Sequence, residues 1–162
     1  MKARDLMVPL QEYLSPGNSL KEAAHLLRVA RRGEEKAGVK ALPVLDEGGN
    51  LVGILSIGDI LKAVYPAYMY LMDLGEFTWD GMVESFAKQA AGKKVEDLMT
   101  GKVITVHEDS TLMECIDHML KNNAKRVPVL NKDNKVVGML YEKDVFYEIT
   151  KSILSEGAGG GK

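Results

Sequence analysis

The hydrophobic and polar positions of this chain form the same series of elements twice. Apolar residues recur at helical spacing over residues 20–30 and again over residues 112–120. A Ser/Thr-x-x-Glu capping box precedes each predicted helix, at Ser19–Glu22 and at Thr111–Glu114. A short apolar run at residues 103–106 predicts a strand before the second of these caps.

Two further apolar runs, at residues 41–45 and 51–55, follow the first predicted helix. The segment between them has the composition of a hairpin loop, and another helix is predicted to begin near Ser56 or Ile57. Residues 123–145 show the same arrangement. The pattern therefore predicts an α+β fold in which the order β-α-β-β-α occurs twice. Because one such unit has little core of its own, the two are expected to pair.

The two series are related by an internal sequence repeat. Residues 38–60 align with residues 123–145, and the aligned positions include the identical pairs Lys40/Lys125, Pro43/Pro128, Val44/Val129, Leu45/Leu130, Val52/Val137, Gly53/Gly138, Leu55/Leu140 and Asp59/Asp144. Upstream, Asp5-Leu6-Met7 matches Asp97-Leu98-Met99, but the number of residues between these two matching segments differs from the number between residues 38–60 and 123–145, which is a change of register. The change of register predicts an insertion in the first unit, around residues 31–36.

The repeat divides the chain into four segments. Residues 1–64 and 93–150 are the two repeats, residues 65–92 connect them, and residues 151–162 contain a helix end and a glycine-rich tail that is expected to be flexible. The connector is expected to be helical and holds the aromatic residues Tyr65, Tyr68, Tyr70, Phe77, Trp79 and Phe86. It either packs on the two units or presents an exposed apolar face to a partner or to a second copy of the chain.

Composition and charge exclude several classes of function. The net charge of −2 argues against nucleic-acid binding by bulk charge. A single cysteine, Cys115, excludes a disulfide framework and a thiolate zinc cluster, is typical of a reducing cytoplasm, and is expected to be a small core residue. No apolar stretch is long enough to span a membrane. The histidines share no metal-ligand spacing, and no catalytic set is apparent, so the chain is not expected to be an enzyme.

Each repeat combines a D-L-M opening, an h-P-V-h strand (h is apolar) and a G-h-h-x-x-x-D turn into a helix. In this combination the chain resembles a tandem pair of CBS (cystathionine-β-synthase-type) domains, a stand-alone Bateman module. The resemblance implies two pseudo-symmetric repeats packed through their sheets. It also implies a non-catalytic regulatory module that binds AMP, ADP, ATP or S-adenosylmethionine between the repeats, without an obligatory cofactor. The expected partners are a second CBS pair in a homodimer and an effector protein.

The family's ligand signature, G-h-h-[Ser/Thr]-x-x-Asp, is complete in the first repeat and ends there with Ser56 and Asp59. The second repeat keeps Asp144 but has Tyr141 in place of the small hydroxyl. A carboxylate can accept both ribose hydroxyls, and a hydroxyl at a helix start suits a phosphate oxygen. An adjacent lysine and arginine, as at residues 125–126, supply charge for a phosphate.

The resemblance also implies that the signature of one repeat faces the residues before the h-P-V strand of the other. Site A would then comprise Ser56, Asp59, Thr105, Ala124, Lys125 and Arg126, and site B would comprise Asp144, Tyr141, Tyr13, Lys40 and Ala41. Site A is favoured for a phosphorylated ligand. Site B is expected either to be empty or to take an uncharged or differently placed adenosyl group.

Alternative explanations remain open at this stage. Ser56 and Asp59 also fit a helix cap, and Lys125 and Arg126 also fit a solvated surface. For the whole module, the alternatives are a ligand-free dimerisation scaffold with vestigial pockets and an S-adenosylmethionine-binding variant.

Overall fold

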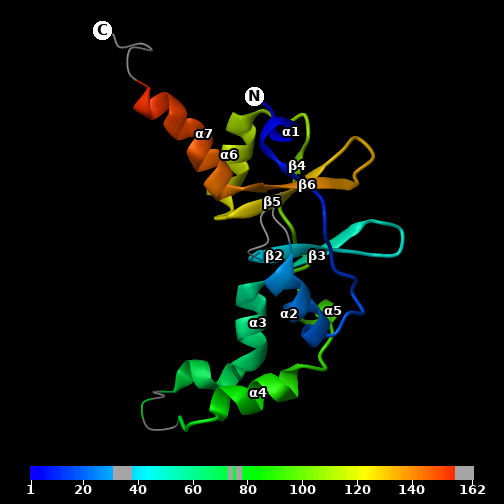
Figure 1. Ribbon diagram of the computed structural model, residues 1–162, viewed down its shortest axis with the longest axis vertical. Coiled ribbons are helices and arrows are strands. Elements are labelled where there is room, and N and C mark those ends of the chain that lie inside the picture. Colours follow the sequence, from blue (N-terminus) through cyan, green and yellow to red (C-terminus); the bar gives the residue numbers. More distant parts are fainter. Residues whose placement is uncertain (31–37, 73–74, 76–77, 156–162) are drawn as a thin grey trace. The chain divides into compact units, whose positions relative to one another are not determined.

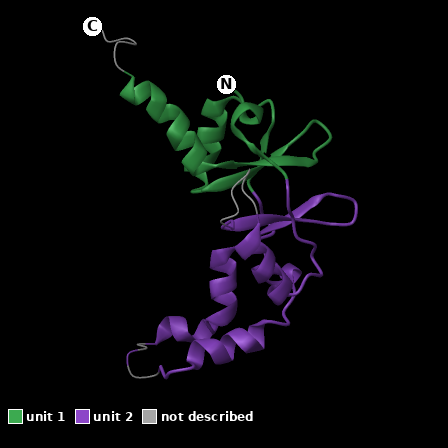
Figure 2. Cartoon of the chain, viewed as in Figure 1, with its two compact units in different colours: residues 1–10, 104–162 green, residues 11–103 purple. Residues whose placement is uncertain are grey.

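The computed structural model describes residues 1–30, 38–72, 75 and 78–155 and divides the chain into two compact units (Figure 2). Unit 1 comprises residues 1–10 and 104–162, and unit 2 comprises residues 11–103. The units are not the sequence repeats. Each contains the body of one repeat together with the D-L-M opening segment of the other.

Unit 1 is built on a four-stranded sheet with the strand order β1-β6-β5-β4 (Figure 1). Strand β4 is parallel to β5, and the other two pairings are antiparallel. The elements of this unit are α1 (Ala3–Leu6), β1 (Val8–Pro9), β4 (Val106–His107), α6 (Leu112–Lys121), β5 (Arg126–Leu130), β6 (Val136–Tyr141) and α7 (Glu142–Leu154).

Unit 2 contains a two-stranded antiparallel sheet, in which Ala41 pairs with Ser56 and Leu45 with Leu51. Leu14 forms a single parallel bridge with Val44 of β2. This bridge takes the place that strand β4 has beside β5 in unit 1. The elements of this unit are α2 (Leu20–Val29), β2 (Ala41–Leu45), β3 (Leu51–Ser56), α3 (Ile57–Val64), the 3-10 helix η1 (Ala67–Leu71), α4 (Met82–Ala90) and α5 (Val95–Leu98).

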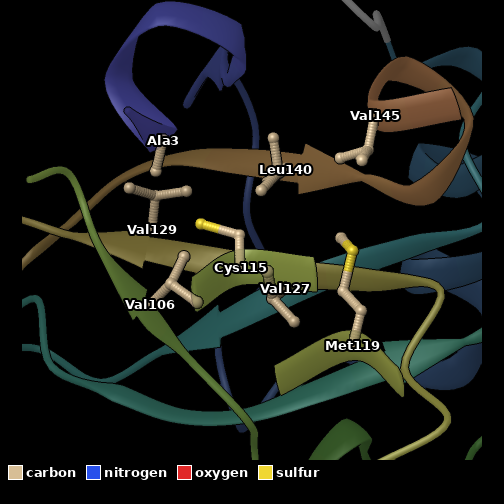
Figure 3. Packing of buried hydrophobic residues seen from close by; sticks show 8 residues of the cluster. All are labelled: Ala3, Val106, Cys115, Met119, Val127, Val129, Leu140 and Val145. Carbon is tan, nitrogen blue, oxygen red and sulfur yellow. The ribbon is translucent and has the colours of Figure 1, made fainter. Parts of the chain in front are cut away.

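Each unit has its own apolar core. In unit 1 the helices α1, α6 and α7 and the strands β4, β5 and β6 contribute buried side chains (Figure 3), namely Ala3, Val106, Cys115, Met119, Val127, Val129, Leu140 and Val145. The buried core of unit 2 consists of Leu14, Ala23, Leu27, Ala30, Leu42, Val44, Leu55 and Val95. One residue from an opening helix is fully buried in each core, Ala3 in unit 1 and Val95 in unit 2.

The glycine of each G-h-h turn lies against the opening segment packed on its unit. A Cβ atom on Gly138 would lie 2.8 Å from the Met7 sulfur, and one on Gly53 would lie 2.5 Å from the Met99 sulfur. Both methionines pack against their unit's core. Only glycine leaves room for this approach, which explains why glycine and D-L-M both recur in the repeat.

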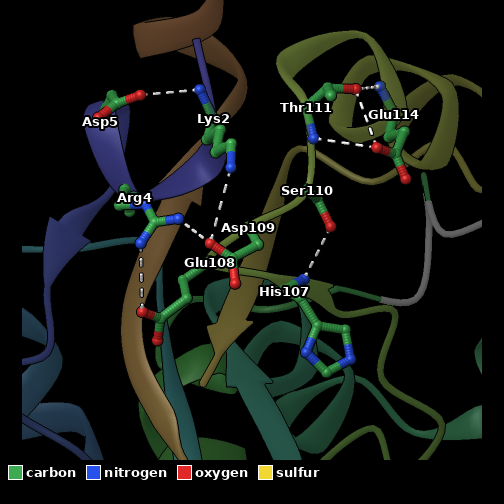
Figure 4. Close-up of polar contacts among 9 residues, drawn as sticks. All are labelled: Lys2, Arg4, Asp5, His107, Glu108, Asp109, Ser110, Thr111 and Glu114. Carbon is green, nitrogen blue, oxygen red and sulfur yellow. Dashed lines mark hydrogen bonds and ion pairs between the residues drawn. The ribbon is translucent and has the colours of Figure 1, made fainter. Parts of the chain in front are cut away.

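Equivalent backbone hydrogen bonds fix both opening helices. They run from Ala3 N to Ser110 O at 2.8 Å and from Leu112 N to Met1 O at 3.0 Å in unit 1, and from Val95 N to Asn18 O at 2.8 Å and from Leu20 N to Lys93 O at 2.7 Å in unit 2. Unit 1 adds ion pairs from Arg4 to Asp109 and Glu108 (Figure 4). Each opening helix is thus attached beside the cap of the unit's first long helix.

Most of the predicted elements are confirmed, including the α+β class, both capping boxes, the helical connector and the burial of Cys115. The strand predicted before the second cap is confirmed, but its predicted bounds, residues 103–106, are wrong, because only Val106 and His107 pair with β5. Residues 103–105 have no strand pairing among the described residues. The predicted insertion at residues 31–36, Phe77 and the glycine-rich tail lie outside the described residues.

Candidate functional site

Ser56 and Asp59 form a capping box at the start of α3. Ser56 ends strand β3 in an extended conformation and is the N-cap of the helix. Its backbone N–H donates to Asp59 Oδ2 at 2.9 Å and its hydroxyl donates to the same oxygen at 3.1 Å. The Asp59 N–H donates back to Ser56 Oγ at 3.2 Å. The predicted cap is therefore present, and it fixes the carboxylate at a half-buried helix start.

The second oxygen of this carboxylate also has a partner. Thr100 Oγ1 donates to Asp59 Oδ1 at 3.4 Å, across 41 positions of sequence. Thr100 is held there because its backbone N–H and carbonyl pair with Ile54 of strand β3. The sequence analysis missed this residue. The sequence does carry one signal for it. The residue that follows the second D-L-M segment has a hydroxyl group, whereas the residue that follows the first D-L-M segment is Val8.

Two of the three unit 2 residues assigned to site B, Lys40 and Ala41, lie next to the same helix start. Ala41 pairs with Ser56 across the sheet, and the Ile57 N–H donates to the Lys40 carbonyl at 2.9 Å. Tyr13 is exposed and lines a separate cavity of about 610 Å³ with residues of α2 that include Lys21 and His25.

Unit 1 brings the remaining predicted residues together at the equivalent place. Arg126 pairs with Tyr141 across strands β5 and β6, and the Glu142 N–H donates to the Lys125 carbonyl at 2.8 Å. Lys125 is exposed, whereas Arg126, Tyr141 and Asp144 are partly buried. Neither basic side chain forms an ion pair with any residue that the structure describes. Both positive charges are therefore available to an anion.

The remaining two residues of site A flank this group in the chain. The Ala124 N–H donates to the Met119 carbonyl at 2.9 Å, which closes the end of α6 directly before Lys125. Thr105 is partly buried and directly precedes strand β4.

The two helix starts differ in how their aspartates are held. Ser56 caps α3 through its side chain, whereas Tyr141 is the N-cap of α7 without a side-chain cap bond. Val8 pairs with strand β6 in unit 1 at the position equivalent to that of Thr100, which pairs with strand β3 in unit 2. Tyr141 and Asp144 have contacts of their own, so the comparison of the two helix starts rests on residue type alone. The small hydroxyl side chains that contact the aspartate at α3, Ser56 and Thr100, are thus replaced by a tyrosine and a valine at α7.

Across the described residues, no group of three or more His, Cys, Asp or Glu side chains could hold a metal ion. None of the described helices has the length and apolar character needed to cross a membrane.

The structure defines an α+β protein made of two copies of one β-α-β-β-α repeat. The chain belongs to the CBS domain family, whose model matches residues 3–66 and 95–151. It is therefore a CBS-pair regulatory module.

Relatives and solved structures support this assignment. The uncharacterized protein MJ1426 of Methanocaldococcus jannaschii is 33% identical over 123 residues, which cover 68% of this chain and 73% of the relative. The chloroplastic CBS domain-containing protein CBSX2 of Arabidopsis thaliana is 29% identical over 150 residues, which cover 87% of this chain but only 60% of that protein. A crystal structure of CBSX2 in complex with AMP has a TM-score of 0.66 at 27% identity, covering 94% of this chain and 98% of that one.

Proposed function

We propose that this CBS-pair module binds an adenosine-containing ligand, AMP, ADP or ATP, and signals its presence to an effector protein. The observation that carries the proposal is the carboxylate of Asp59, which is oriented at a helix start by hydroxyls on both of its oxygens. A carboxylate held in this way suits the paired hydroxyls of ribose.

The phosphate of the ligand would find its partners in both units. The Ser56 hydroxyl lies at the start of α3, where the helix dipole favours an anion. Lys125 and Arg126 offer two positive charges without described ion-pair partners. As the resemblance to CBS domains implies, we propose that Ser56, Asp59, Thr105, Ala124, Lys125 and Arg126 belong to one nucleotide site.

The similarity to CBSX2 supports the ligand class, since that protein has been crystallised with AMP. Asp144, Tyr141, Tyr13, Lys40 and Ala41 are proposed as the second, weaker site, because Tyr141 does not cap its helix through its side chain. That second site is either empty or takes an uncharged adenosyl group, with S-adenosylmethionine as the alternative ligand.

Exposed apolar side chains on α7, such as Phe146 and Ile153, support a homodimer as the assembly.

The direct test is calorimetry and thermal shift of the purified protein with AMP, ADP, ATP, S-adenosylmethionine and adenosine. A ligand that binds only the folded state raises the melting temperature by mass action. We expect saturable binding of at least one phosphorylated ligand, and tighter binding of AMP than of adenosine. If none of the five binds at millimolar concentration to protein freed of co-purified nucleotide, the module is a scaffold instead.

A matched pair of variants separates capping from ligand binding. Ser56→Ala and Ser19→Ala both remove the serine of a capping box in unit 2, so each should lower the stability by about 1 kcal/mol. Only Ser56→Ala should also weaken AMP binding, by about tenfold, because it alone removes a hydroxyl that orients Asp59 in the proposed site. Equal affinities in the two variants would assign Ser56 to the cap alone.

A further inference from the structure

The aromatic connector forms an apolar pocket with the end of α3. The pocket has a volume of about 510 Å³ and lies within unit 2, among α3, η1 and α4. Pockets of this size that are mainly apolar with a few polar groups are typical of small-molecule sites. Its lining is almost entirely apolar or aromatic and includes Leu61, Val64, Met69, Met82, Val83 and Phe86.

Buried methionines and fixed aromatic rings shape this pocket. Met69 and Met82 are both buried. The Tyr65 hydroxyl donates to the Met69 carbonyl at 2.9 Å, and the Tyr65 ring packs edge-on against Tyr70 at 4.8 Å between centroids. Because Tyr65 is fixed by both contacts, one wall is formed before any ligand arrives. Methionine side chains adapt to ligands of different shape.

The rim of the pocket consists of apolar side chains that face water. Leu61 is 68% exposed, Tyr70 64% and Val83 66%. Large apolar residues gathered around one cavity, rather than scattered, mark a contact site. Binding an apolar group here would remove this surface from water, which is the main source of affinity for such ligands.

One charged residue lines the pocket among the described residues, Lys62 on α3. Lys62 is exposed and has no ion-pair partner among those residues. No described carboxylate lines the cavity. The lining therefore combines an apolar interior with a single positive charge.

We infer that this pocket binds a small organic anion with an apolar body and one acidic group, such as a carboxylate. The apolar body lies against Met69 and Met82, and the acidic group faces Lys62. Helix α3 begins at the Asp59 capping box and ends at this pocket. The inference is independent of the proposed nucleotide site, because it rests only on residues of the connector and of the distal end of α3.

The experiment uses anilinonaphthalene sulfonate, an aromatic anion that fluoresces in apolar surroundings, and displaces it with decanoate, decanol or decylammonium. We expect saturable binding of one probe per chain and displacement by decanoate at lower concentration than by decylammonium. Near-ultraviolet circular dichroism must stay native, since this probe also binds loosely packed states. Failure of the probe to bind the native protein, or preference for decylammonium, would overturn the inference.

Two matched pairs of variants locate the site. Val83→Trp narrows the pocket and should weaken probe binding about tenfold, whereas Met113→Trp, at an exposed position on α6, should leave it unchanged. Lys62→Glu should weaken decanoate about fivefold but leave decanol unaffected, whereas Lys88→Glu, on α4 outside the lining, makes the same change of charge without effect. Equal probe binding by Val83→Trp and Met113→Trp would exclude this pocket as the site. Equal decanoate binding by Lys62→Glu and Lys88→Glu would exclude Lys62 as the partner of the acidic group and so overturn the inferred preference for an anion.

Discussion

At the scale of single residues, the two aspartates of the repeat illustrate how an identical position acquires different surroundings. Asp59 accepts hydrogen bonds from Ser56 on one oxygen and from Thr100 on the other. Beside Asp144 the equivalent positions hold Tyr141 and Val8. A side chain that is already oriented loses less conformational freedom on binding, so these contacts prepare Asp59 to receive a ligand.

Thr100 is therefore expected to act as a positioning residue for the proposed nucleotide site. Thr100→Val keeps the shape of the side chain but removes the donor to Asp59, and should weaken AMP binding about threefold to tenfold. Thr100→Ser should retain most of the affinity. Thr150→Val removes a hydroxyl that donates to the Tyr147 carbonyl in α7 and serves as the control. Calorimetry that finds the same affinity for Thr100→Val and Thr150→Val would contradict this role.

At the scale of elements, helix starts are the best-defined local features of the chain. The first long helix of each unit begins with a complete capping box, Ser19–Glu22 for α2 and Thr111–Glu114 for α6. The backbone N–H of the cap residue donates to the glutamate carboxylate in both boxes and lowers the pKa of Glu22 and of Glu114 below the ordinary value of 4.5. The ionised form of each glutamate is thus the form that the folded helix favours.

This shift predicts an acid dependence of stability. A carboxylate whose pKa is lower in the folded state stabilises the fold above its unfolded pKa, and this contribution is lost as the pH falls through the folded pKa. The free energy of unfolding should therefore decrease below pH 4.5, and Glu22→Gln with Glu114→Gln should make the decrease shallower. Urea titrations at several pH values measure this. Glu47→Gln with Glu84→Gln, at exposed positions outside these boxes, is the control with the same change of charge. Equal pH dependence of the unfolding free energy in the two double variants would refute the explanation.

At the scale of the whole molecule, the repeat, its helices and its hairpins follow from local patterns, which is why the sequence predicts them well. Helical spacing and capping boxes involve residues only a few positions apart. The sequence also placed Ser56 with Asp59 for the same reason. The exchange of the opening segments and the contact of Thr100 with Asp59 depend on packing between distant residues, and no local pattern encodes them.

The exchange makes a prediction that distinguishes the units from the sequence repeats. Met7 lies against Gly138 in unit 1, and Met99 lies against Gly53 in unit 2. Met7→Ala should therefore destabilise unit 1, although Met7 belongs to the first repeat. For a half-buried methionine we expect a loss of about 1–2 kcal/mol. Met99→Ala is the matched control, since it should destabilise unit 2.

Cys115 reports which unit opens, because it is the only cysteine and is buried in the core of unit 1, where burial raises the pKa of its thiol. A thiol reagent in the native state can therefore modify Cys115 only when unit 1 opens. Met7→Ala should accelerate this modification about fivefold to thirtyfold, and Met99→Ala should have a much smaller effect. Faster modification in Met99→Ala would mean that the sequence repeats are the folding units. Equal acceleration would mean that the two units open together, as one cooperative structure.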